Sequence, residues 1–242
     1  MTTLTTPQVS PRSVSPSATM ESPLRTPENR TLLHGVDWAA YLRFRNDERN
    51  DSLRMTYCSG RLEMMSPSRR HESVTWHIGR FVECWCDEWD IAYDPSGSTT
   101  LTAEELQKGL EPDTCYYIQN ELAIRERDEI DLSIDPPPDL AVEVEVTSPL
   151  LSKLKIYAAI KVPEVWQWQN GRIRVLLLND AGEYVESDDS RCLSGFPFEE
   201  MVRLIEQRHV LDKMSLLRQF REWIREFRKP QIPTKPEANP ES

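Results

Sequence analysis

The nine residues from Asp139 to Thr147 constrain the fold of this chain more than any other segment. Apolar side chains occupy every second position between them, at Leu140, Val142, Val144 and Val146. Side chains alternate between the two faces of a strand, so this pattern predicts a β-strand with one apolar face against a core. The other face carries Glu143 and Glu145, whose Cα atoms lie about 6.5 Å apart by strand rise. Two carboxylates therefore share one wall of a sheet.

Two turn signals predict antiparallel hairpins elsewhere in the chain. Ser59-Gly60 separates strands expected at 55–58 and 61–65, and Asn170-Gly171 separates strands expected at 165–169 and 172–178, with an extension at 184–186. Further strands are expected at 98–102 and 113–118, with a short helical segment at 104–108 between them.

Apolar residues at helical spacing predict helices at 71–89, 198–206 and 212–227. Ser148 and Pro149 suit the N-cap and first position of another helix that runs through residue 160. Lys153 then lies one turn into that helix. This mixed order of strands and helices predicts an α/β fold in which helices flank a central mixed β-sheet.

Composition sets the limits of the folded part. Residues 1–31 and 229–242 are rich in Pro, Ser, Thr and other polar residues without apolar periodicity, so we expect disordered tails around one domain at 32–228. No segment has the apolar length to cross a membrane or the pattern of a secretory signal, which predicts a cytoplasmic protein. The five cysteines match no zinc or redox spacing and are expected to be reduced.

Four residues suggest a chemistry when they are taken together. Asp113, Glu143 and Glu145 offer hard oxygen ligands, and Lys153 offers a nearby cation. Such a set suits Mg²⁺ and the hydrolysis of a phosphodiester bond by a metal-activated water. Each element alone is generic, because a Glu-Val-Glu strand is more often a solvated sheet face. Residue types alone therefore favour a structural interpretation.

Several longer segments favour a functional interpretation of these residues instead. They are Gly60–Pro67 followed by His71-Glu72, Gly109–Ile118, Pro137–Ser148 and Lys153–Trp166. In this order, over about residues 36–225, they resemble the Uma-type putative restriction endonuclease family of the PD-(D/E)XK nuclease superfamily. The resemblance implies a restriction-endonuclease-like core.

The resemblance also implies roles for the acidic residues and the lysine. Asp113 corresponds to the metal-binding aspartate of the PD motif, Glu143 and Glu145 occupy the strand acid positions, and Lys153 is the catalytic lysine, displaced to the next helix. Thr147 stands where the superfamily usually has that lysine. We take Glu145 as the principal ligand, with Glu143 as second ligand or hydrogen-bond partner.

Three further residues have competing interpretations. Glu72 matches the glutamate that the superfamily often adds from its first helix, although a first-turn Glu is equally favoured by the helix dipole. His71 contacts phosphate or caps the helix, and the structural role is preferred. Asp139 lies too near Glu145 along one strand to be the separate PD ligand, so it ranks below Asp113.

The function implied by the resemblance is that of an endonuclease that acts on DNA with Mg²⁺ or Mn²⁺, as a homodimer. The alternative is an inactive nuclease-fold protein that binds nucleic acid or a protein. With 29 Lys and Arg against 40 Asp and Glu, the net charge of −11 opposes binding to a polyanion. Charge can still be local, and one cluster of arginines offers a track for the phosphates of DNA: Arg43, Arg45, Arg49, Arg54, Arg61, Arg69, Arg70 and Arg80. A glycoside hydrolase is set aside, because neighbouring carboxylates on one strand do not flank a glycosidic bond.

Overall fold

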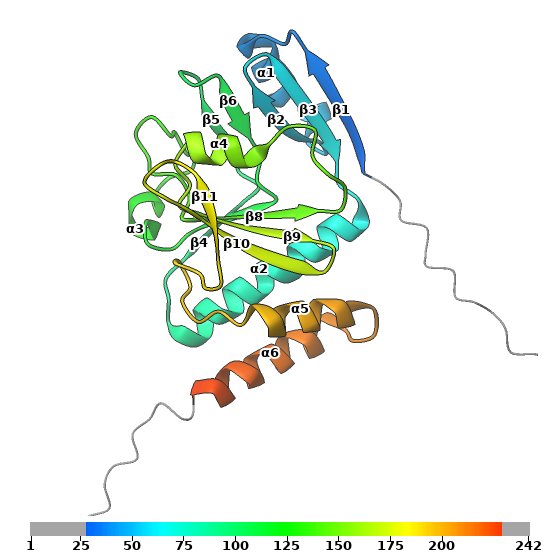
Figure 1. The fold of residues 1–242 in the computed structure, drawn as a ribbon, viewed down its shortest axis with the longest axis vertical. Helices are drawn as coiled ribbons and strands as arrows, with labels where there is room; N and C mark the ends of the chain where they lie inside the picture. The colour runs from blue at the N-terminus through cyan, green and yellow to red at the C-terminus, as the bar shows by residue number, and fades with distance from the viewer. Residues whose placement is uncertain (1–27, 229–242) are drawn as a thin grey trace, which may run out of the picture.

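The computed structural model describes residues 28–228 (Figure 1). The predicted tails at 1–27 and 229–242 lie outside the described residues. Residues 29–31, which the sequence analysis placed in the tail, instead begin strand β1 (Asn29–His34). This strand pairs antiparallel with β3 (Arg61–Ser66), and Arg30 makes an ion pair with Glu63 of β3. Backbone pairing and this ion pair hold a strand that has little apolar periodicity.

The strands form two sheets. The N-terminal sheet is antiparallel, in the order β1, β3, β2 (Arg54–Cys58), β6 (Lys108–Leu110) and β5 (Leu101–Ala103). The central sheet runs β11 (Tyr184–Ser187), β10 (Arg172–Leu178), β9 (Glu164–Gln169), β8 (Leu140–Glu145), β7 (Thr114–Tyr117) and β4 (Asp94–Gly97). Only the β8–β9 pair is parallel among these described strands. The central sheet is therefore mixed, as predicted.

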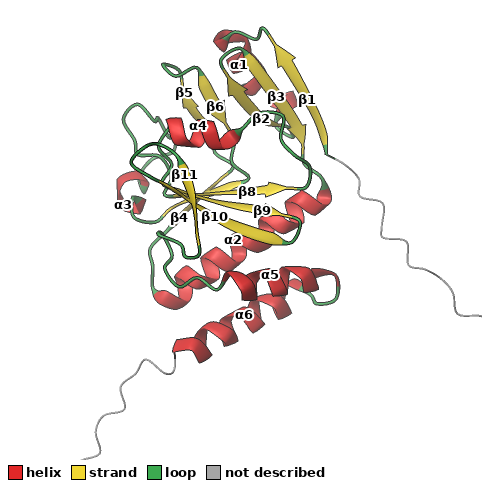
Figure 2. Cartoon of the chain, in the orientation of Figure 1, coloured by secondary structure: helices red, strands yellow, loops and turns green. Residues whose placement is uncertain are grey.

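Helices cover both faces of the central sheet (Figure 2). Helices α2 (Arg69–Trp89), α5 (Phe198–Glu206) and α6 (Lys213–Arg228) share one core with β8, β9 and β10. Helix α4 (Lys153–Ala159) lies on the opposite face, where it packs with β5 and β6 of the N-terminal sheet. The predicted α/β class is confirmed. The remaining helices are α1 (Trp38–Arg45), η1 (Glu48–Asn50), α3 (Glu121–Ile124) and η2 (Gln207–His209).

Strand β8 shows the predicted alternation. Leu140, Val142 and Val144 enter the core beneath α2. The second face of β8 is also covered, by α4, so Glu143 is only 6% exposed. The interpretation of this Glu-Val-Glu face as a solvated sheet surface is therefore wrong for Glu143.

Two predicted elements need correction. The helix expected from Ser148 begins only at Lys153, because the N–H groups of Leu150 and Leu151 donate to the Glu63 carboxylate at 3.0 and 2.7 Å and keep the preceding loop non-helical. The helical segment expected at 104–108 is a turn between β5 and β6, closed by backbone bonds to Ala103 and Glu104. A positive φ of 51° at Gln107 ends that turn.

The other main elements agree with expectation. Both predicted hairpins form, and both turn pairs have positive φ, 46° and 84° at Ser59-Gly60 and 52° and 77° at Asn170-Gly171. All five cysteines lie in the described residues and are free. Within residues 28–228, the structure has no helix with the length and apolar character to cross a bilayer.

Phe220 on α6 provides a test of how the last helix is held. Its side chain is fully buried, and its ring centroid lies 4.6 Å from that of Phe81 on α2. We expect Phe220→Ala to lower the free energy of unfolding by about 3–5 kcal/mol, through lost apolar burial and a residual cavity. Urea unfolding measures this loss. Met214→Ala on the exposed side of the same helix is the control, and an equal effect of the two variants would contradict this packing.

Candidate active site

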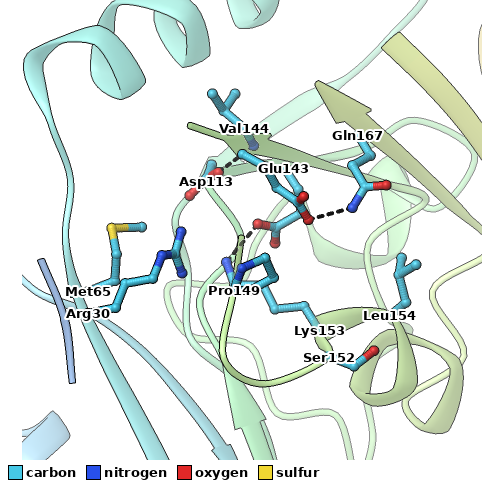
Figure 3. Close-up of a pocket in the computed structure, with 11 residues that line it drawn as sticks. Arg30, Met65, Asp113, Glu143, Val144, Pro149, Ser152, Lys153, Leu154 and Gln167 are labelled. Carbon is cyan, nitrogen blue, oxygen red and sulfur yellow. Dashed lines mark hydrogen bonds and ion pairs between the residues drawn. The ribbon is translucent and has the colours of Figure 1, made fainter. Parts of the chain in front are cut away.

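A cavity of about 80 Å³ lies between the central sheet and the N-terminal sheet (Figure 3). It is lined by side chains from β8, from the start of α4, from β9 and from β1 and β3. Four of the five predicted site residues line it together: Asp113, Glu143, Glu145 and Lys153. Asp113 thus meets three residues that follow it by 30 to 40 positions in the sequence.

Asp113 stands immediately before β7 and continues the hydrogen bonding of that strand with its side chain. Its Oδ2 accepts from the Val144 N–H at 2.6 Å and is 3.0 Å from His71 Nε2. Oδ1 is buried and has no hydrogen-bond partner among the described residues. Burial alone would raise the pKa of Asp113, but the charge of Lys153 and the hydrogen bond from His71 outweigh it, so the pKa is lowered. Asp113 is therefore an anion with one free oxygen.

Glu143 and Lys153 form a buried ion pair. Lys153 Nζ lies 2.7 Å from Glu143 Oε2 and donates to the Glu111 carbonyl at 3.1 Å, while the Tyr157 hydroxyl donates to Glu143 Oε1. Burial, together with the charge of Asp113, raises the pKa of Glu143 to about 7 despite Lys153. Burial opposes the charge on Lys153, but the two carboxylates outweigh it and raise the lysine pKa. The ammonium group is thus kept protonated.

The loop before α4 sets the position of Lys153. Glu63 on β3 accepts from the loop at Leu150 and Leu151 through Oε2, and its Oε1 accepts from Arg30 at 2.7 Å. Arg30 also donates to the Thr147 hydroxyl at 3.0 Å, two residues after the end of β8. The N-terminal sheet therefore fixes both ends of the segment that joins β8 to α4.

Glu145 occupies the same wall as Glu143 but has different partners. Gln167 and Gln169 of the parallel neighbour β9 donate to its two oxygens at 2.5 and 3.0 Å. Burial raises the pKa of Glu145. Lys153 contacts Glu143 and makes no hydrogen bond to Glu145.

Glu72 is not brought to the cavity. Its side chain is 54% exposed and lies 3.8 Å from Arg54. His71 reaches Asp113 instead, because successive helix residues point about 100° apart and only one of the two can face the site. Asp139 has a structural role, as it accepts from the Ile118 and Asn120 N–H groups at 2.7 and 2.9 Å.

Sequence reasoning missed three members of this cluster. Tyr157 lies four residues after Lys153, on the same helix face, and that spacing was a usable signal. His71 was noticed but interpreted as structural. Arg30 gave no signal, because it stands in a polar segment beside the predicted tail.

The contact between His71 and Asp113 makes the stability of the protein depend on pH. Burial would lower the pKa of His71, but the hydrogen bond and charge of Asp113 outweigh it and raise the pKa. The stabilisation from this contact is then complete below the unfolded pKa of about 6.5 and is lost as the pH rises through the folded value.

We therefore expect the difference in free energy of unfolding between wild type and His71→Gln to be largest near pH 6 and to shrink as the pH is raised. Urea unfolding over a pH series measures it. His209→Gln, which changes an exposed histidine, is the control. A difference that stays constant with pH would contradict a charged His71–Asp113 pair.

Comparisons with known proteins identify the family of the chain. The model of the Uma2 family, described as "Putative restriction endonuclease", matches residues 38–204. A search of curated proteins found no match. Among solved structures, the chain is similar to a putative nuclease of the DUF820 family from Anabaena variabilis ATCC 29413, with 16% sequence identity and a TM-score of 0.41. That alignment covers 69% of this chain and 90% of the other. Because the family model spans more than half of the sequence, including Asp113, Glu143 and Lys153, the chain belongs to the Uma2 family of restriction-endonuclease-like proteins.

Proposed function

We propose that this protein is a Mg²⁺-dependent endonuclease that hydrolyses phosphodiester bonds of DNA. The observation that carries the proposal is the buried contact between Lys153 and Glu143 beside Asp113. Burying a lysine is unfavourable even when carboxylates pair with it, so such a pair in a cavity marks a candidate functional site. Membership of a restriction-endonuclease-like family suggests a phosphodiester substrate for that site.

The donor set fits a hard divalent cation. No group of three His, Cys, Asp or Glu side chains within residues 28–228 is already arranged around a metal position. Asp113 nevertheless keeps one buried oxygen without a partner, and Glu143 lines the same cavity. Mg²⁺ is commonly held by one or two carboxylates and several waters, so one oxygen of each carboxylate would suffice, with Glu143 giving up its hydrogen bond from Lys153 or from Tyr157.

The two strand carboxylates have different roles in this proposal. Both oxygens of each carboxylate accept hydrogen bonds, those of Glu143 from Lys153 and Tyr157 and those of Glu145 from Gln167 and Gln169. Only Glu143 is joined to Lys153, the cation whose charge also lowers the pKa of Asp113. We therefore assign Asp113 and Glu143 as principal ligands, with Glu145 in a supporting position. This reverses the order expected from the sequence. Bound Mg²⁺ would polarise the phosphate and lower the pKa of a water.

The protein's own residues orient the reacting groups. His71 and the Val144 N–H hold one oxygen of Asp113, which aims the other. Tyr157 and the Glu111 carbonyl fix Glu143 and Lys153 relative to each other. In the proposed reaction the Lys153 ammonium stabilises the negative charge that develops on the phosphate oxygens. The homodimer expected from the resemblance stays a prediction.

Cleavage of supercoiled and single-stranded DNA in Mg²⁺ or Mn²⁺ tests the proposal. We expect Asp113→Asn, Glu143→Gln and Lys153→Met each to lower the rate by about 10²-fold or more, because each removes charge stabilisation from the transition state. Glu145→Gln should have a smaller effect, and Glu72→Gln, on the exposed side of α2, is the matched carboxylate control. A wild-type protein that binds DNA but does not cut it would favour the binding-module alternative.

Binding of Mg²⁺ alone gives a second, independent test. A ligand present at about ten times its Kd adds roughly 1.4 kcal/mol to the stability of the folded state, which raises the melting temperature by roughly 3–6 °C for a chain of this size. We expect this shift in the wild type and in Glu72→Gln, but not in Asp113→Asn or Glu143→Gln. Loss of the shift in Glu145→Gln alone would restore Glu145 as the principal ligand.

A further inference from the structure

A second cavity, of about 360 Å³, lies beside the candidate active site and takes no part in the chemistry described above. Its polar wall consists of Arg45, Asn50, Asp51, Arg54, Ser98 and Glu111. Arg45 lies in α1, Asn50 in η1 and Arg54 in β2, and the other three come from loops beside these elements. Its volume falls within the range of about 300–1,000 Å³ that is typical of small-ligand sites.

Glu111 connects the two cavities. Its carboxylate lines the second cavity, while its backbone carbonyl accepts a hydrogen bond from Lys153 in the first. Only Pro112 separates it from Asp113, so the two Cα atoms lie at most about 7 Å apart. Because Lys153 is hydrogen-bonded to a residue that lines the second cavity, a nucleotide next to a phosphate at Lys153 would lie close to that cavity.

Several polar groups of this cavity have no partner within residues 28–228. Arg54 Nε is buried without a hydrogen bond. The side chains of Ser98 and Asp51 make no hydrogen bond to any described residue. Arg45, by contrast, forms an ion pair with Glu111, in which Arg45 Nε lies 2.5 Å from the carboxylate. The cavity wall thus combines the hydrogen-bond donors of Arg54 and Ser98 with the acceptor carboxylate of Asp51.

This combination distinguishes between possible ligands. A phosphate offers only acceptors and would face the carboxylates of Asp51 and Glu111. The edge of a nucleobase presents donors and acceptors together. Two arginines and two carboxylates also leave the cavity wall formally neutral, which suits a neutral ligand. Leu53 and Met55 complete the lining with apolar surface for the flat face of a ring.

We propose that the second cavity binds one unpaired nucleobase of the substrate, next to the bond that is cut, and so selects the cleavage position. This inference rests on the proposed nuclease function, because it takes the strand at Lys153 as its starting point. A base inside a duplex must leave the stack to enter such a pocket. The pocket therefore favours single-stranded or locally opened nucleic acid.

Binding without cleavage tests the pocket directly. The probes are thymidine, deoxyadenosine and deoxycytidine homopolymers of about 12 nucleotides and an abasic strand of the same length, measured by fluorescence anisotropy in EDTA. We expect the wild type to bind at least one homopolymer about tenfold more tightly than the abasic strand. Arg54→Gln and Ser98→Ala should reduce this ratio several-fold. Arg61→Gln removes an exposed arginine without an ion pair in the described part of the chain, and should leave the ratio unchanged.

Other results would overturn the inference. Equal binding of homopolymers and the abasic strand, or no binding of any strand, excludes a base pocket. An equal loss for all probes in Arg54→Gln would make Arg54 a phosphate contact instead. Ser98→Ala changes only one hydroxyl, so it keeps the test valid if Arg54→Gln unfolds. If the wild type cuts DNA but shows no base-dependent binding, the pocket is excluded and the nuclease proposal stands. If it shows base-dependent binding but does not cut, the pocket stands and the nuclease proposal fails.

Discussion

The buried ion pair between Glu143 and Lys153 is the interaction on which the site depends. Strand β8 is covered on both faces, so Glu143 enters a region where an unpaired carboxylate would be strongly destabilising. Lys153 and Tyr157 satisfy its two oxygens. Lys153, the first residue of α4, reaches back to the strand, while the contacts of Glu63 with the preceding loop set where that helix begins.

The N-terminal sheet has a role beyond covering the cavity. Glu63 connects Arg30 on β1 to the loop before α4, and Arg30 reaches Thr147, two residues after the end of β8. The family match begins at residue 38, so Arg30 lies outside it. The cavity of this chain is therefore completed by a strand that the shared family pattern does not include. Helix α6 also lies outside the family match, and its Phe220 packs on Phe81 of α2 in the core on the other face of the central sheet.

Most of the fold was predictable from the sequence, and two of the exceptions share a physical cause. The alternation in β8, the two turn pairs with positive φ, and the helical periodicity of α2 and α6 are local signals, and each produced the expected element. The helix expected from Ser148 failed because Glu63, 87 residues away from Leu150, competes for the loop N–H groups. The strand at 29–31 was missed because its stability comes from pairing with β3. Both errors involve partners that no local pattern identifies.

The same distinction, between local sequence signals and partners distant in the sequence, applies to the candidate site. The sequence and the family resemblance selected the four residues that line the cavity, but they could not rank Glu143 against Glu145, because period two places both on one face. The proposed ranking rests on neighbouring elements, since α4 supplies a lysine to one carboxylate and β9 supplies two glutamines to the other.

The charge distribution around the cavity reconciles an acidic protein with a polyanionic substrate under the proposed function. Glu28, Glu63, Asp113, Glu143 and Glu145 surround the cavity or its supporting contacts, against the cations Arg30 and Lys153. This surplus of negative charge repels a bare phosphate and attracts a divalent cation. A phosphate would then enter favourably only after the metal has reversed the local sign. On this argument the acidity of the site makes strand binding at the cut depend on the metal, while contacts outside the cavity, including the neutral second cavity, hold the strand without it.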